Sequence, residues 1–212
     1  MDKEQIKKAL EEVKKQPKRK FTQSYDLVIN LKNFVVKQNP LDFFVTLPFS
    51  KGKKIKIAAF VDQQLADQAQ KYCDLAIRET GFDKYADKKT GKKLAKEYDY
   101  FIAQATLMPK IAAAFGKALG TQGKMPNPKL GCVVPPNAIL EPLVKKLSTT
   151  VHLTAKKGMN LQCLVGREDQ PEHEIIDNIL AVYNTVLKNL PNEEQNIKNV
   201  QLKVTMGQPI KI

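Results

Sequence analysis

The sequence predicts an α/β protein with two domains, and three observations support this. Strands in which apolar and polar residues alternate occur near both ends of the 212-residue chain. Short, wholly apolar strands alternate with helical patterns in the middle, as in a parallel sheet with helical crossovers. Linker-like residues, 48–54, separate the two styles. We therefore expect a split α+β domain of residues 1–54 and 149–212, into which an α/β domain of residues 55–148 is inserted.

The first part of the chain predicts one helix and two strands. Ile6, Leu10 and Val13 recur at helical spacing within residues 3–16, and Pro17 follows. Two strands come next, one with Tyr25, Leu27, Ile29 and Leu31 on one face, the other from Phe43 to Leu47.

The middle of the chain predicts buried strands separated by helices. The run from Ile55 to Val61 suits a strand that is buried on both faces. A helix around Leu107 to Phe115 precedes a stretch rich in Gly and Pro, residues 116–136, which predicts a loop. The other expected elements are a helix with Leu65, Ala69 and Tyr72, strands at Leu75–Ile77 and Tyr100–Ala103, a partly helical Lys-rich stretch between these strands, and a helix over 137–147.

The last part returns to alternating strands and contains the clearest helical pattern. Residues 172–190 place their apolar side chains on one side, and Pro191 ends the helix. Two strands are expected before this helix, with Val151 and Leu153 opposite Thr150, His152 and Thr154 in the first, and from Leu161 to Val165 in the second. In the final strand, Val200, Leu202, Val204 and Met206 are expected on one face.

The charge balance indicates an anionic partner. There are 35 Lys and Arg residues against 22 Asp and Glu, a formal net charge of +13. Three stretches lack acids altogether: the residues between Tyr100 and Leu140, residues 142–167 and residues 195–212. Such stretches favour nucleic acid as the partner, and the excess of Lys over Arg favours contact with the phosphate backbone over base reading. The alternative is a Lys-rich composition with solvated helix faces.

Other classes of protein find little support. No signal peptide and no apolar stretch of membrane-spanning length is visible. We expect no membrane partner, because no basic amphipathic helix stands apart from a core. The scattered Cys73, Cys132 and Cys163 indicate reduced thiols in a cytoplasmic protein rather than a metal site. No catalytic constellation is visible, so the sequence predicts neither an enzyme nor a cofactor.

The glycines of residues 116–125 raise the alternative of a nucleotide-binding enzyme that uses the inserted domain. Ala118 stands where a P-loop has its first Gly, and Met125 stands where the magnesium-binding hydroxyl belongs. A dinucleotide-binding site also needs a glycine-rich turn directly after the first parallel strand, and residues 60–64, which follow this strand, contain no glycine. Glycine-lined backbone beside Lys124 can still meet a phosphate chain. Gly120, Gly123, Lys124 and Met125 are therefore expected to form a secondary RNA contact, against the simpler interpretation of a tight surface loop.

Several short motifs together resemble one family. They are Phe21-Thr22-Gln23-Ser24, Leu47-Pro48 with Lys51-Gly52-Lys53, Leu107-Met108-Pro109, Leu119-Gly120 with Gly123-Lys124-Met125-Pro126-Asn127-Pro128, and Thr205-Met206-Gly207. In their order and spacing, essentially end to end, they resemble the L-one family of large-subunit ribosomal proteins in its archaeal and eukaryotic style. Each motif is weak by itself, and the series is distinctive.

The resemblance implies a Rossmann-like, three-layer inserted domain and a structural role in the large ribosomal subunit. It implies direct binding to the mobile stalk of large-subunit rRNA, beside the exit site for deacylated tRNA, whose release the protein would assist. It also implies repression of its own operon through an mRNA leader that mimics the rRNA site. The protein would be cytoplasmic, on the ribosome, and monomeric away from it.

The resemblance further implies which residues bind RNA. Carried over by position, the main surface would contain Lys20, Phe21, Ser24, Thr205, Met206 and Gly207, with Lys156, Lys157 and Arg167 as weaker candidates. Gly207 would let the RNA backbone come close. Many family members have Gly-Pro-x-Leu-Gly-Pro-Arg-Gly where this chain carries Lys117, Thr121 and Gln122 among its glycines. We expect a less stiff loop there and the loss of an arginine contact.

Overall fold

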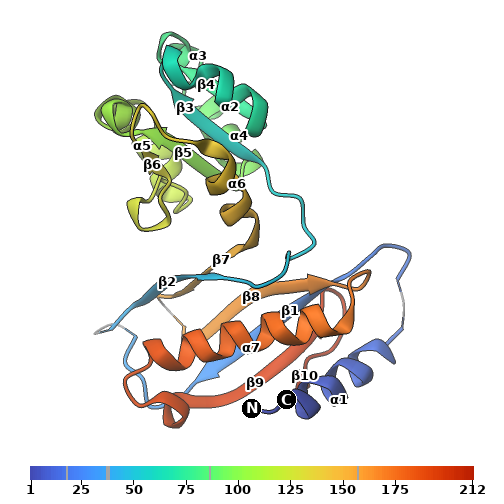
Figure 1. Cartoon of the computed structure of the whole chain (residues 1–212). Coiled ribbons are helices and arrows are strands. Elements are labelled where there is room, and N and C mark those ends of the chain that lie inside the picture. The colour runs from blue at the N-terminus through green and yellow to red at the C-terminus, as the bar shows by residue number, and fades with distance from the viewer. Residues whose placement is uncertain (18, 37–38, 86, 157) are drawn as a thin grey trace. The chain divides into compact units, whose positions relative to one another are not determined.

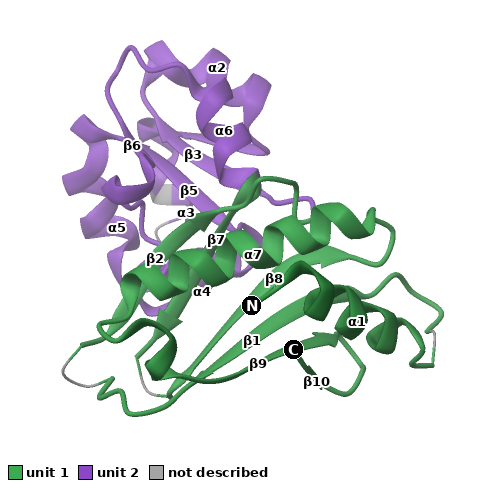
Figure 2. Cartoon of the chain, turned by 60° about the horizontal axis from the view of Figure 1, so that its bottom comes forward, with its two compact units in different colours: residues 1–53, 149–212 green, residues 54–148 purple. Residues whose placement is uncertain are grey.

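The chain divides into two compact units. The computed structural model describes residues 1–17, 19–36, 39–85, 87–156 and 158–212. One unit comprises Met1–Lys53 and Thr149–Ile212 and is called the terminal unit; the other comprises Lys54–Ser148 and is called the inserted unit (Figure 2).

The terminal unit is built on an antiparallel four-stranded sheet in the order β10-β9-β1-β8. Helices α1 (Lys3–Lys14) and α7 (Glu172–Asn189) lie on the same face of this sheet (Figures 1 and 2). The strands are β1 (Ser24–Leu31), β8 (Asn160–Arg167), β9 (Ile197–Val204) and β10 (Ile210–Lys211).

Alternating burial produces this two-layer packing. Every second residue of β1 from Tyr25 to Leu31 is buried beneath the helices, as the sequence predicts. Ile175, Ile179 and Val182 of α7 are buried in the same core. Lys14 pairs with Glu172 at 2.5 Å between α1 and α7, but exposed pairs of this kind contribute little stability.

Two further strands, β2 (Leu41–Thr46) and β7 (Thr150–Ala155), form an antiparallel pair. Val151 and Leu153 are buried, as predicted, and His152 and Thr154 are exposed. Thr150, which was expected on the face of His152 and Thr154, is fully buried. Its carbonyl accepts a hydrogen bond from the buried Lys51 Nζ at 2.9 Å, so the strand begins inside the protein.

The inserted unit has three layers around a parallel sheet in the order β4-β3-β5-β6. Tyr72 of α2 hydrogen-bonds to Glu141 of α6 on one side, while α4 and α5 pack against each other on the other. The predicted α/β fold class is therefore confirmed. The elements are β3 (Ile57–Val61), β4 (Leu75–Arg78), β5 (Tyr100–Gln104), β6 (Val133–Val134), α2 (Ala66–Tyr72), α3 (Phe82–Tyr85), α4 (Lys88–Glu97), α5 (Met108–Thr121) and α6 (Leu140–Thr149).

One expectation for the inserted unit was wrong: residues 116–121 are helical rather than a loop. Phe115 and Leu119 continue the buried face of α5 for another turn, which outweighs the helix-weakening glycines. The helix ends at Thr121, and Gly123 follows two residues later with a φ of 66° that suits glycine. Lys124 N donates to Leu119 O and Gly123 N to Gly120 O, which satisfies the last carbonyls of the helix.

A cluster of aromatic rings forms much of the core of the inserted unit. Phe60 of β3 packs against Phe115 at 5.0 Å, Phe82 at 5.7 Å and Phe101 at 5.8 Å between ring centroids. Phe60 is fully buried, so this one side chain joins the sheet to the α4–α5 layer.

The face of the terminal sheet opposite α1 and α7 carries a half-buried acid, Asp26. Asp26 lies opposite Leu164 in β8 and Lys203 in β9, beside a hollow of about 290 Å³. Burial raises the pKa of the Asp26 carboxyl, and Lys203 opposes this only in part.

Asp26→Asn is expected to raise the free energy of unfolding at pH 7. A carboxyl whose pKa is higher in the folded than in the unfolded state destabilises the fold once it is ionised. The gain should disappear as the pH falls below the unfolded value of about 3.9. Urea denaturation at pH 7 and at pH 3.5 measures both effects.

Asp42→Asn provides a control of opposite sign. Burial raises the pKa of Asp42, but the hydrogen bonds from His152 and Lys156 together with their charges lower it by more, so the pKa is lowered overall. This substitution should therefore destabilise the protein at pH 7. The interpretation of Asp26 is wrong if Asp26→Asn also destabilises at that pH.

Candidate nucleic-acid interface

The start of β1 and the turn after β9 meet at one end of the terminal sheet. Tyr25 pairs with Val204 across the two strands, which places the residues before Tyr25 beside those after Val204. We call the predicted residues at this junction the platform: Lys20, Phe21, Ser24, Thr205, Met206 and Gly207. The structure thus joins Ser24 to Thr205 from opposite ends of the chain, with Met206 and Gly207 next to Thr205 and with Phe21 and Lys20 three and four residues before Ser24.

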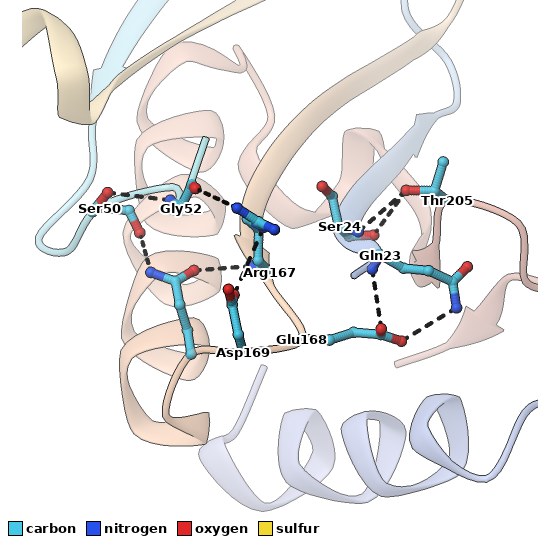
Figure 3. A network of polar contacts seen from close by, with 9 residues as sticks. Gln23, Ser24, Ser50, Gly52, Arg167, Glu168, Asp169 and Thr205 are labelled. Carbon is cyan, nitrogen blue, oxygen red and sulfur yellow. Dashed lines mark hydrogen bonds and ion pairs between the residues drawn. The ribbon is translucent and has the colours of Figure 1, made fainter. Parts of the chain in front are cut away.

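Ser24 and Thr205 form the centre of the platform (Figure 3). Ser24 N donates to Thr205 Oγ1 at 3.2 Å, and Thr205 N donates to Ser24 O at 3.1 Å. Thr205 Oγ1 also donates to Ser24 O at 3.4 Å, a long hydrogen bond. The hydroxyl keeps acceptor capacity and is exposed, so it can also bond a ribose hydroxyl.

Gln23 holds the turn from beneath, and the sequence interpretation assigned it no role. Its side chain is 2% exposed, and its Oε1 accepts from Met206 N at 3.1 Å. Glu168, just after β8, accepts from Gln23 N at 3.0 Å and from Gln23 Nε2 at 3.3 Å (Figure 3). These bonds fix the amide orientation of Gln23 and thereby the position of the Met206 backbone. The sequence feature that could have indicated this role of Gln23 is its position inside the Phe-Thr-Gln-Ser motif.

Gly207 is needed for packing within the protein. A Cβ on Gly207 would overlap Gln16 Oε1 and Val204 Cγ2, well inside van der Waals contact. The Gln16 amide in turn accepts from Gln208 N at 2.8 Å and donates to Gln208 O at 2.9 Å. Residues of the protein itself therefore leave no room for a side chain at Gly207. The sequence interpretation had expected the RNA backbone to lie close to this glycine.

Two large apolar side chains are exposed on the platform. Phe21 is 53% exposed and Met206 is 61% exposed. The prediction that the last strand extends to Met206, on the same face as Val200, Leu202 and Val204, was wrong. Strand β9 ends at Val204, where the chain turns so that β10 can pair with β9. Exposed apolar surface beside polar turn atoms suits contact with RNA bases and riboses.

Arg167 lies beside the platform but is engaged elsewhere. Its backbone is opposite Ser24 in the β1–β8 pair. Its side chain points toward Gly52, whose carbonyl accepts from Arg167 Nη1 at 3.2 Å, and Nε lies 3.7 Å from Asp169 (Figure 3). Gln170 accepts from Arg167 N and donates to Ser50 O, both at 2.8 Å. Arg167 therefore anchors residues 50–52, and its guanidinium is directed away from Thr205.

The remaining terminal candidates add less. Lys156 pairs with Asp42 at 2.9 Å on the β2–β7 pair, and Lys157 lies outside the described residues. Acid-free stretches of sequence thus do not remain acid-free in space, because neighbouring elements supply the acids. Glu79 pairs in the same way with Lys110.

The secondary candidates of the inserted unit divide into two kinds. Gly120 and Gly123 are exposed, with open space where a Cβ would stand. Lys124 Nζ donates to Tyr98 O at 2.8 Å at the end of α4, and Met125 packs against the core. Lys124 and Met125 thus support the fold. Lys117, Thr121 and Gln122 are exposed on α5 or just after it.

The structure also bears on the nucleotide-binding alternative. At the carboxyl ends of β3 and β5, where doubly wound sheets bind dinucleotides, the buried Gln104 accepts from Asp62 N at 3.0 Å.

All three cysteines are buried and free, and burial raises the pKa of Cys73 and Cys132 to about 11. Within the described ranges, we find no group of three His, Cys, Asp or Glu residues that could hold a metal, and no helix suited to crossing a membrane.

Comparison with known proteins decides the family. The model of the "Ribosomal protein L1p/L10e family" matches residues 13–208. The chain belongs to this family. The large ribosomal subunit protein uL1 of Nanoarchaeum equitans is 39% identical over 213 residues, covering 99% of this chain and 98% of that protein. The uL1 proteins of Methanothermococcus thermolithotrophicus and Pyrococcus abyssi are 40% and 38% identical over 216 residues, covering all of this chain and 99% and 96% of those proteins.

Family membership confirms two predictions from the sequence. The resemblance seen in the short motifs extends along nearly the whole chain, and the relatives come from archaeal species. The family consists of structural ribosomal proteins, so the protein is not an enzyme, as the sequence predicts.

Proposed function

We propose that this protein is a cytoplasmic, structural constituent of the large ribosomal subunit that binds large-subunit rRNA directly through the platform. The stalk beside the tRNA exit site is the proposed target. The observation that carries the proposal is the junction of Ser24 with Thr205. Met206, next to Thr205, and Phe21, three residues before Ser24, are both exposed. Membership in a ribosomal protein family supports the same conclusion.

The chemistry of the platform suits folded RNA. Lys20 is exposed and can approach phosphate, while Thr205 and the turn backbone can bond ribose hydroxyls. Phe21 can stack on a base, and Met206 supplies a polarizable apolar contact. Because Gln23 and Gln16 hold the turn in place, little ordering cost remains for binding.

Phe21→Ala and Met206→Ala are each expected to weaken binding to the stalk rRNA by about tenfold without unfolding the protein. Both side chains are more than half exposed, so the fold loses little when they are truncated, whereas stacking on a base is worth roughly 1–3 kcal/mol. Filter binding at fixed salt measures the loss.

Met159→Ala is the matched control, because Met159 is 52% exposed and lies outside the platform. It should leave rRNA affinity unchanged. Equal affinities for wild type, Phe21→Ala and Met206→Ala would show that the platform is not the rRNA site.

The same surface supports a regulatory proposal. An mRNA leader folded like the rRNA site would present the same backbone to the platform, so the protein would repress its own operon. A translation extract with that leader tests this: Met206→Ala should inhibit less than wild type, and no inhibition by wild type would contradict it. We also propose that the protein assists the release of deacylated tRNA and that it is monomeric away from the ribosome.

A further inference from the structure

Helix α4 of the inserted unit carries a lysine stripe that the platform does not explain. We define it as Lys89, Lys92, Lys93 and Lys96, which are all exposed. Their spacing of i, i+3, i+4 and i+7 places them within about 100° of arc around the helix and along about 10 Å of its axis. Four cations therefore face the same way.

The opposite side of α4 is fixed in the protein. Gly91, Leu94 and Ala95 are buried, and a Cβ on Gly91 would lie 3.2 Å from Ala118 Cβ of α5. Lys124 holds the end of the helix through the Tyr98 carbonyl. The stripe consequently projects outward from a rigid support.

The stripe differs in its surroundings from three other lysines of the inserted unit. Lys56 pairs with Glu97, Lys110 with Glu79, and Lys145 with Glu141. Within the described part of the chain, no ion pair or hydrogen bond is found for the four side chains of the stripe. Four like charges at helical spacing repel one another, and an anionic partner would reduce this electrostatic repulsion.

We propose that the lysine stripe of α4 is a second RNA-binding surface that contacts the phosphate backbone of rRNA without reading its sequence. Lysines act as point charges toward phosphate and lack the planar fork that reads bases. A membrane surface fits less well, because interfacial helices insert apolar side chains, and those of α4 are buried in the core. The proposal rests on the proposed function for its choice of rRNA.

Changing all four residues, Lys89→Gln, Lys92→Gln, Lys93→Gln and Lys96→Gln, tests the stripe in the full-length protein. Glutamine keeps good helix propensity, so α4 should remain folded, which circular dichroism and the Tm verify. Each neutralised phosphate contributes roughly 0.7–0.9 to the log–log salt slope, so the slope with large-subunit rRNA should shrink by about 3. Affinity near 0.1 M salt should fall by about tenfold or more.

A control with the same change in net charge separates position from total charge. Lys3→Gln, Lys56→Gln, Lys110→Gln and Lys145→Gln together remove four lysines that are each paired with an acid. The control should reduce the salt slope by less than about 1. Equal slopes for the two quadruple variants would overturn the proposal, because only net charge would then matter.

A generic RNA duplex and anionic vesicles distinguish the remaining outcomes. If the rRNA salt slope of the stripe variant equals that of wild type, the proposal for the stripe is wrong. The Phe21 and Met206 variants test the platform separately. If wild type shows no preference for stalk rRNA but its duplex binding depends on the stripe, the proposed function fails and the stripe stands. If the stripe variant loses binding only to phosphatidylserine vesicles, RNA is the wrong partner.

Discussion

Gly207→Ala is expected to weaken binding to stalk rRNA by more than tenfold and to lower the free energy of unfolding by about 1–3 kcal/mol. The added methyl group would overlap Val204 Cγ2 and Gln16 Oε1, so the turn must move. Val204 is buried in the core and cannot give way easily, and moving Gln16 breaks its two hydrogen bonds to Gln208. Filter binding at a temperature where both proteins are folded, together with urea denaturation, measures the two effects.

Gly120→Ala is the matched control for this change. Gly120 is exposed in α5, and its Cβ position has open space. Alanine should therefore stabilise the helix by about 0.5–1 kcal/mol and leave binding through the platform unchanged. If Gly207→Ala binds stalk rRNA as tightly as wild type, the position of this turn does not contribute to recognition.

Phe60→Ala is expected to destabilise the inserted unit by about 3–5 kcal/mol, because it removes the ring that packs against three other phenylalanines. We expect the terminal unit to keep binding stalk rRNA after the inserted unit melts, since the hydrogen bonds of the platform all lie within the terminal unit. Its affinity should fall by about the tenfold that loss of the lysine stripe of α4 brings. Thermal unfolding followed by rRNA binding between the two transitions provides the measurement.

Leu27→Ala supplies the comparison in the other unit. Leu27 is fully buried beneath the helices of the terminal unit, and its truncation should cost about 2–5 kcal/mol there. Binding should then disappear when the terminal unit melts. Loss of rRNA binding on melting of the inserted unit in Phe60→Ala would show that the terminal unit does not suffice for recognition.

Patterns that repeat along the chain predicted most of the fold. The alternation of Tyr25, Leu27 and Ile29 determines which face of β1 is buried, and the wholly apolar run ending at Val61 predicts a strand covered on both sides. Both patterns report burial directly, because a strand turns successive side chains to opposite faces. The motifs at Phe21 and Thr205 likewise identified two segments that prove to be neighbours.

Predictions of local structure from composition were wrong where tertiary packing had the larger effect. The glycines of residues 116–121 predict a loop, yet Phe115 and Leu119 continue the buried face of α5. The two-residue strand β6 is too short to leave a periodic signal, and its place depends on pairing with β5. In both cases contacts between distant segments determine the local structure.

The sequence by itself determined the family, the layers of each unit and the surplus of positive charge. Only the tertiary structure decided which charges and polar groups remain available. Arg167 and Lys156 are occupied by partners far along the chain, and Gln23 supports a turn near the other terminus. The lysines of the α4 stripe have no ion pair among the residues that the structure describes. The physical reason is that charge and hydrogen-bonding capacity belong to residues, whereas their satisfaction depends on neighbours that folding brings from elsewhere in the chain.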